Sequence, residues 1–267
     1  MKPNNVSGLY RELTRTDIMS RLMPLIRSGK FVLNERGKIQ PIALSIEPQT
    51  PWIHVKSCKD RDCGVWHNIM FDIFHILPSP CLNCWKVVAA PQTLKELFGL
   101  LEFQESLNRP SKCGIEVRDY TPRLYGGYFY NWSVEEGQEC WNKVNNGLAA
   151  AGYPMPVILK RACTEFEMVF GDSTKWQITD EQLQLEEDIY NAFELGDNFR
   201  ELEQHPIVRP RIIRSWIQWA FKHGDKTYLD YTGGEPLYPD TVKYHDMDLS
   251  KLGTYQQEIV KPENING

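Results

Sequence analysis

The fold of this chain is decided by residues 85–161, which begin WKVVAAPQTLKELFGLL and end PVILKR. The first six residues are mainly hydrophobic and predict a strand. Thr93-Leu-Lys-Glu96 is a capping box that begins an amphipathic helix, and Ser133-Val-Glu-Glu136 begins a second helix that Gly152 ends. Alternating hydrophobic and polar residues predict three further strands, at residues 113–119, 128–132 and 156–161.

The resulting order, β-α-β-β-α-β, is the split βαβ or ferredoxin-like arrangement. It places both helices on one face of a four-stranded antiparallel sheet, so we predict an α+β fold. Alternation along each strand assigns side chains to the two faces. The helix-covered face is expected to hold Val87, Ile115, Val117, Val157 and Leu159. The opposite face is expected to hold Lys86, Glu116, Arg118, Tyr128, Tyr130 and Lys160.

Outside this core, the sequence divides into three further segments. Residues 1–50 predict an N-terminal helix, with a kink or break at Pro24, followed by a hairpin. Residues 51–84 form a cysteine-rich module, which leaves 85–178 for the ferredoxin-like core. Residues 179–267 predict two helices and a tail, the first helix beginning after the N-cap Thr179. Residues 164–170 are expected to extend the fourth strand or to form a short strand of their own.

The composition excludes several classes of protein. The 267 residues are 42% hydrophobic and 24% charged, which excludes a wholly disordered or fibrous chain. No apolar run is long enough to span a membrane, so no membrane partner is expected. The first residues contain no apolar signal segment, and seven cysteines are an odd number. We therefore expect reduced thiols and a cytoplasmic location.

Four of the cysteines are clustered in two pairs, Cys58-x4-Cys63 and Cys81-x2-Cys84. Two short pairs of thiolates can supply the four ligands of a tetrahedral zinc ion, so we predict a zinc knuckle. His67 is an alternative fourth ligand, and an iron–sulfur cluster is the alternative cofactor. The remaining cysteines, Cys113, Cys140 and Cys163, are interpreted as packing residues.

An enzymatic alternative for this cluster is weakly supported. Pro80-Cys81-x-x-Cys84 matches the second half of the zinc-deaminase signature. The first half requires a glutamate two residues after a histidine, and neither His54 nor His67 has one. The residues after Cys84 also predict a strand, whereas that signature belongs at the start of a helix. Deamination is therefore not predicted.

The formal net charge of −5 argues against a chain coated in basic surface, although residues 1–178 carry +3. Residues 125–132, YGGYFYNW, are rich in aromatics and fall on the third strand, where RNA-recognition sheets carry rings that stack on bases. We therefore predict a zinc-binding protein that acts on or with single-stranded nucleic acid. The residues expected to bind it are Lys86, Arg118, Tyr128, Tyr130 and Lys160.

Two alternatives come from other classes of protein. In the first, the chain is a metal-dependent nuclease or nucleotidyl enzyme whose catalytic residues are Glu116, Arg118 and Lys160, with Glu165 and Glu167 after the fourth strand. In the second, the same charged and aromatic residues bind a protein partner in an assembly. The sequence leaves both open.

Overall fold

The structure, a computed structural model, describes residues 15–29, 31–42, 51–56, 63–194 and 204–238. The chain divides into two units, residues 1–228 and 229–267. In the second unit, the structure describes residues 229–238, where the amides of Thr232 and Gly234 donate to the carbonyl of Leu229. The short 3-10 helix η6 (Lys226–Tyr231) runs from the first unit into the second. The other elements of the described residues belong to the first unit.

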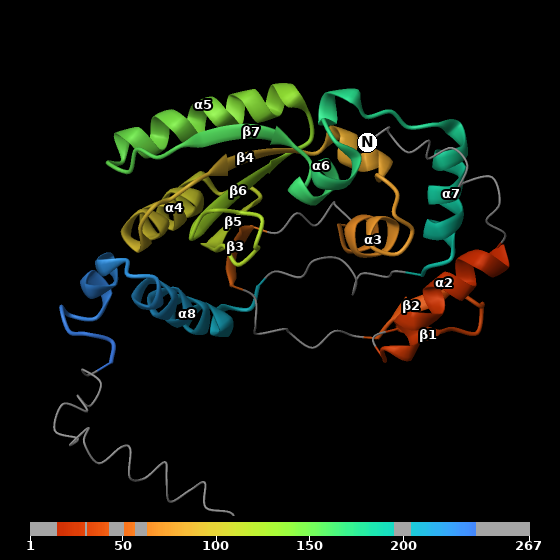
Figure 1. Cartoon of the computed structure of the whole chain (residues 1–267), viewed down its shortest axis with the longest axis horizontal. Helices are drawn as coiled ribbons and strands as arrows, with labels where there is room; N and C mark the ends of the chain where they lie inside the picture. Colours follow the sequence, from red (N-terminus) through yellow and green to blue (C-terminus); the bar gives the residue numbers. More distant parts are fainter. Residues whose placement is uncertain (1–14, 30, 43–50, 57–62, 195–203, 239–267) are drawn as a thin grey trace, which may run out of the picture. The chain divides into compact units, whose positions relative to one another are not determined.

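The first unit contains a five-stranded antiparallel sheet with several helices, which confirms the predicted α+β class (Figure 1). The strand order is β3-β5-β6-β4-β7. Four strands follow the predicted segments, and β3 is an addition that the sequence analysis did not predict. The strands are β3 (Trp52–Lys56), β4 (Trp85–Ala89), β5 (Ser111–Ile115), β6 (Tyr125–Asn131) and β7 (Val157–Arg161).

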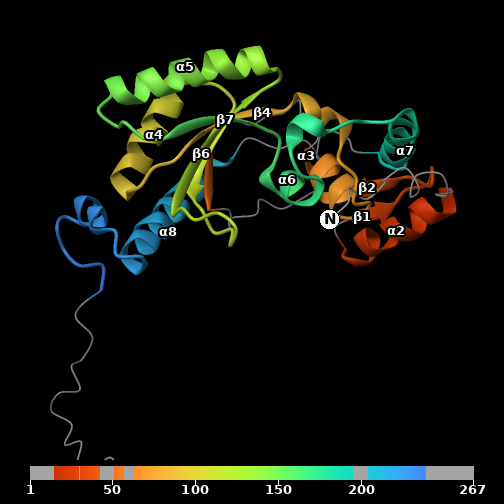
Figure 2. The ribbon, with the colours of Figure 1, turned by 45° about the horizontal axis from the view of Figure 1, so that its top comes forward.

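Two helices, α4 (Leu94–Leu107) and α5 (Val134–Ala150), cover one face of the sheet (Figures 1 and 2). Both predicted capping residues are confirmed, because Thr93 and Ser133 accept hydrogen bonds from the amides of Glu96 and Glu136. The helices bury a hydrophobic layer against the sheet. Its fully buried members include Val87, Leu97, Leu100, Cys113, Phe129, Cys140 and Val144.

One predicted face assignment is wrong. Val117 was expected beneath the helices, but 52% of it is exposed, whereas only 3% of Glu116 is exposed. The reason is that β5 ends at Ile115, so alternation no longer fixes which residues are buried beyond that point. The other predicted members of the helix-covered face, Ile115 among them, follow the observed register.

A second hydrophobic core lies outside the sheet. It joins a helix, a two-stranded hairpin, the segment after Cys63 and a further helix through Leu22, Ile39, Met70 and Ile189. Pro24 lies inside the first helix, which neither ends nor breaks there. The elements that form this second core are α2 (Arg15–Arg27), β1 (Phe31–Leu33), β2 (Ile39–Pro41), α3 (Cys63–Val65), the π-helix η1 (Trp66–Phe71) and α7 (Asp180–Asn191).

The prediction for residues 164–170 is wrong, because they form a helix, α6 (Thr164–Phe170), rather than a strand. Phe166 is the one buried residue of α6, and it packs with Leu77, Ala162 and Trp176 in a third small core. The remaining elements are the 3-10 helices η2 (Ser79–Asn83), η3 (Ser173–Lys175) and η5 (Pro206–Val208), and the predicted C-terminal helix α8 (Arg209–Lys222).

Candidate functional site

The face of the sheet opposite α4 and α5 carries most of the residues predicted to bind nucleic acid. We call it the lysine face. Its register places Tyr130, Lys86 and Lys160 in one row across β6, β4 and β7. Directly opposed residues on adjacent strands share a face. The row two residues further along each strand, formed by Lys112, Tyr128, Val88 and Ile158, therefore continues the same surface. The lysine face is formed by Lys86, Val88, Lys112, Tyr128, Tyr130, Ile158 and Lys160.

Rings and cations alternate on this face. The Nζ of Lys86 lies 5.6 Å from the centre of the Tyr130 ring, and the Nζ of Lys112 lies 5.0 Å from the Trp52 ring. Trp52, which β3 adds beside β5, packs edge-on against Tyr128 with 5.5 Å between ring centres. These contacts are within the range of cation–π and aromatic interactions. The fifth strand therefore adds a third ring to the two tyrosines predicted from the sequence.

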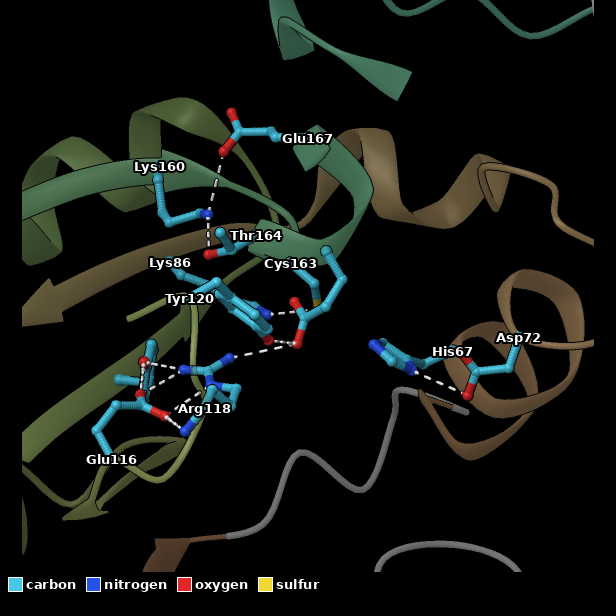
Figure 3. A network of polar contacts seen from close by, with 12 residues as sticks. His67, Asp72, Lys86, Glu116, Arg118, Tyr120, Lys160, Cys163, Thr164 and Glu167 are labelled. Carbon is cyan, nitrogen blue, oxygen red and sulfur yellow. Dashed lines mark hydrogen bonds and ion pairs between the residues drawn. The ribbon is translucent and has the colours of Figure 1, made fainter. Parts of the chain in front are cut away.

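Beside the lysine face, Arg118 is the centre of a polar network (Figure 3). Its Nε donates to Glu116 at 2.7 Å, and its Nη2 donates to Glu116 and to the Tyr128 hydroxyl at 2.5 Å each. Its Nη1 lies 3.4 Å from Glu165 Oε1, which also accepts from the hydroxyl of Tyr120 at 2.5 Å. The guanidinium thus joins two carboxylates and two phenols.

Burial and charge together set the ionisation of this network. Burial would raise the pKa of Glu116, but the hydrogen bonds and charge of Arg118 and the hydroxyl of Tyr128 lower the pKa below its ordinary value. Burial raises the pKa of Tyr128 to about 12, and the neighbouring Glu116 contributes to the rise. Glu116 was expected on an open surface. Instead it is a buried carboxylate that Arg118 and Tyr128 already satisfy.

Lys160, the third predicted catalytic candidate, contacts α6. Its Nζ donates to the Thr164 hydroxyl at 2.8 Å and lies 3.2 Å from Glu167 Oε2 (Figure 3). Glu116 and Lys160 therefore have separate partners, and the structure does not bring the three catalytic candidates into one contact group.

The cysteines of the predicted knuckle lie in different surroundings. Cys58 lies outside the described residues. Cys63 is exposed, Cys81 is half-buried in η2, and Cys84 is buried at the start of β4. Burial raises the pKa of the Cys81 thiol, and the neighbouring Cys163, Cys84 and Cys63 raise it further. The described cysteines of both pairs are therefore close enough to interact electrostatically.

Cys163, which was interpreted as a packing residue, belongs to the same neighbourhood. The pairing of β4 with β7 sets Trp85 opposite Arg161, and the Ala162 amide donates to the Cys84 carbonyl at 2.7 Å. The Nζ of Lys86 then lies 2.9 Å from the sulfur of Cys163. Both strands were predicted from the sequence, but their pairing, which brings Cys163 to Lys86, was not.

His67 lies near Cys163 and comes from η1, the π-helix that contributes Met70 to the second core. One ligand atom each from His67, Cys163 and Glu165 lie within 4.8 Å of one another, and all three side chains are half-buried. His67 was predicted as an alternative ligand of the knuckle, whereas Cys163 was not, and Glu165 was considered only for the divalent ion of a nuclease or nucleotidyl enzyme. In the described part of the chain, this is the one group of three or more histidine, cysteine or acidic side chains with metal-ligand spacing.

No family model matches this chain, and neither the curated proteins nor the solved structures include a match to it. In the described ranges, no helix is both long enough and apolar enough to cross a membrane.

Proposed function

We propose that this chain is a zinc-binding protein that acts on or with single-stranded nucleic acid through the lysine face. The observation that carries the proposal is the alternation of rings and cations on one sheet face, beside a group of neighbouring cysteines. Every base has a flat face, so aromatic stacking tolerates any sequence, while cations meet the phosphates.

The ferredoxin-like description of the core belongs to the same proposal. Strands β5, β6, β4 and β7 are neighbours in that order, and each neighbouring pair is antiparallel. Helix α4 connects β4 to β5, and α5 connects β6 to β7. Both features support a split βαβ unit, in which the face opposite its two helices is the one that RNA-recognition sheets use.

The charges of the lysine face indicate how it would bind. Glu116 and Glu165 pair with Arg118, and Glu167 pairs with Lys160, so carboxylates already neutralise part of the positive charge. Stacking on Trp52, Tyr128 and Tyr130 would then contribute more to affinity than phosphate contacts. Each stacked base contributes about 1–3 kcal/mol.

Binding of a fluorescent single-stranded oligonucleotide tests this part of the proposal. Tyr130→Ala should weaken binding roughly 5- to 150-fold, the equivalent of about 1–3 kcal/mol for one stacked base. Lys160→Ala should weaken it less and should also reduce its dependence on salt. Tyr153→Ala is the control, because this ring packs at Gly99 on the helix side of the sheet.

If the wild-type protein retains neither RNA nor DNA at low salt, the nucleic-acid proposal fails. A protein partner then becomes the better explanation of the lysine face.

The zinc part of the proposal rests on Cys58, Cys63, Cys81 and Cys84, whose thiols need a reducing compartment such as the cytoplasm. Protein purified without added metal should contain zinc, and Cys81→Ser should lose the ion of the cysteine pairs together with local structure, because metal binding and folding of the site are coupled. Cys113→Ser, at a buried position in the main core, should keep the metal. Elemental analysis measures both variants. A folded wild-type protein without zinc or iron, unchanged by a chelator, would contradict the prediction.

A further inference from the structure

We propose that His67, Cys163 and Glu165 form a second, open metal centre for a divalent transition-metal ion of the zinc class. This site uses none of the cysteines of the two predicted pairs. It shares no cysteine with the zinc knuckle of the proposed function, although His67 lies between the two cysteine pairs. Variants of Glu165 and His67 therefore test it apart from the cysteine pairs.

The spacing of the three ligand atoms fits a single ion. Zinc binds nitrogen, oxygen and sulfur at about 2.0–2.3 Å, so two ligands of one tetrahedral ion are roughly 3.6 Å apart. The ligand atoms of His67, Cys163 and Glu165 already lie within 4.8 Å of one another. Small side-chain rotations would bring them to ligand distance. A set of imidazole, thiolate and carboxylate suits zinc and its neighbours better than magnesium or calcium, which prefer oxygen ligands alone.

His67 is held in an orientation that suits a ligand. Its ring stacks on Phe166 and is tilted against Phe71, with 5.5 Å between ring centres in each case. Its Nδ1 lies 3.8 Å from the carboxylate of Asp72, on the side away from Cys163 (Figure 3). Carboxylates beyond a histidine ligand orient the ring and its tautomer in many metal sites. His67 also lies in the π-helix η1, a rare conformation that often occurs at functional sites.

Cys163 is placed by the junction between β7 and α6. Ala162, which precedes it, is fully buried and has a φ of 49°, in the left-handed region that costs a non-glycine residue about 1–2 kcal/mol. Such strained residues cluster at functional sites. The ammonium of Lys86, 2.9 Å from the sulfur, would compensate the negative charge of a metal-bound thiolate.

Glu165 has an oxygen atom available for a metal. Its Oε1 accepts from Tyr120 and faces Arg118, whereas its Oε2 is buried and has no hydrogen-bond partner among the described residues. A buried carboxylate oxygen without a partner is costly, and a bound cation would satisfy it. This orphaned oxygen is an observation independent of the ligand spacing, and it points to the same site.

Three protein ligands leave one tetrahedral position open. In zinc proteins, sites of this kind take a water molecule or a substrate at the fourth position, whereas four cysteine ligands close the site. We therefore infer that the metal centre of His67, Cys163 and Glu165 can bind an added ligand, whereas the predicted knuckle has no free coordination position.

Titration of the metal-free, full-length chain with Co²⁺ tests the inference. Cobalt bound by Cys163 should give a sulfur-to-metal absorption band, and Zn²⁺ should displace it. Glu165→Gln and His67→Gln should each weaken binding at this centre by at least the roughly 10–100-fold that loss of an outer-shell partner costs. The matched control is Glu167→Gln, two residues further along α6, whose carboxylate pairs with Lys160 and which should bind cobalt as the wild type does.

The inference is overturned if Glu165→Gln and His67→Gln both bind cobalt with wild-type affinity. These two variants decide the outcome even if Cys163→Ser fails to fold. Cys81→Ser separates the two sites: metal lost from Cys81→Ser alone supports the knuckle and overturns the inference. Metal lost from Glu165→Gln but not from Cys81→Ser supports the inference and contradicts the knuckle.

Discussion

At the scale of single residues, Glu116 and Arg118 form an ion pair that is joined by two hydrogen bonds between their side chains. The Glu116 side chain is 1% exposed, and it accepts from Arg118 at 2.5 Å and 2.7 Å. Both residues hydrogen-bond to Tyr128, although they lie beyond Ile115, where alternation along β5 no longer applies. Alternation could not predict that Glu116 is buried, because that burial depends on Arg118 and Tyr128 covering the carboxylate.

The lowered pKa of Glu116 makes the stability of this pair depend on pH. An unfolded glutamate has a pKa of about 4.3, so the stabilisation is fully present above about pH 5. It is lost as the pH falls through the lowered folded-state value. Near neutral pH, Glu116→Gln should reduce the free energy of unfolding by about 1.5–3 kcal/mol, the range for hydrogen bonds to charged groups.

Urea unfolding of the wild type and of Glu116→Gln at pH 7 and pH 3 measures this effect. The difference between the two proteins should shrink at the lower pH. The control is Glu102→Gln, at an exposed position, which should unfold at the same urea concentration as the wild type at both pH values. A difference between wild type and Glu116→Gln that is the same at both pH values would show that the pair does not titrate as described.

At the scale of elements, local patterns predicted well those segments that are stabilised locally. The caps at Thr93, Ser133 and Thr179 each begin a helix as predicted, since a cap satisfies the helix's own amides. Residues 164–170 were misread because Phe166, Met168 and Phe170 alternate as in a strand. Tertiary packing decides in favour of the helix, which buries Phe166 and leaves 61% of Met168 exposed.

Strand β3 was missed for a different reason: its partner β5 lies about 60 residues later in the sequence. The contact depends on Gly114, opposite Trp52, because a Cβ there would lie 2.2 Å from the Pro51 carbonyl oxygen. A backbone atom cannot yield as a side chain can. Gly114→Ala should therefore destabilise the protein by about 1–3 kcal/mol, the usual cost of overpacking.

The control for this change is Gly126→Ala, at the position paired with Gly114 on β6, where the nearest atoms are 3.5 Å away in the Tyr128 side chain. Thermal unfolding of both variants should show a lower midpoint for Gly114→Ala alone. Equal midpoints for the two variants would mean that β3 does not constrain this position.

At the scale of the whole molecule, the candidate metal centre joins parts of the chain that no local pattern connects. His67 comes from the π-helix next to the second core, whereas Cys163 and Glu165 follow β7. The sequence predicted His67 as an alternative ligand four residues after Cys63, and it predicted β4 and β7 as strands without predicting that they pair. The missing step was this pairing, whose register sets Trp85 opposite Arg161 and so carries Cys163 to the cysteine pair.

The pairing of β4 with β7 also has a consequence for how the chain is made. Lys86 and Lys160 lie opposite each other but are 74 positions apart in the sequence. Ribosomes add about 5–20 residues per second, so β4 is synthesised roughly 4–15 seconds before its neighbour β7. During that interval one edge of β4 offers unpaired backbone groups, which favour aggregation. We therefore expect the nascent chain to be more prone to aggregation before β7 is made than after it.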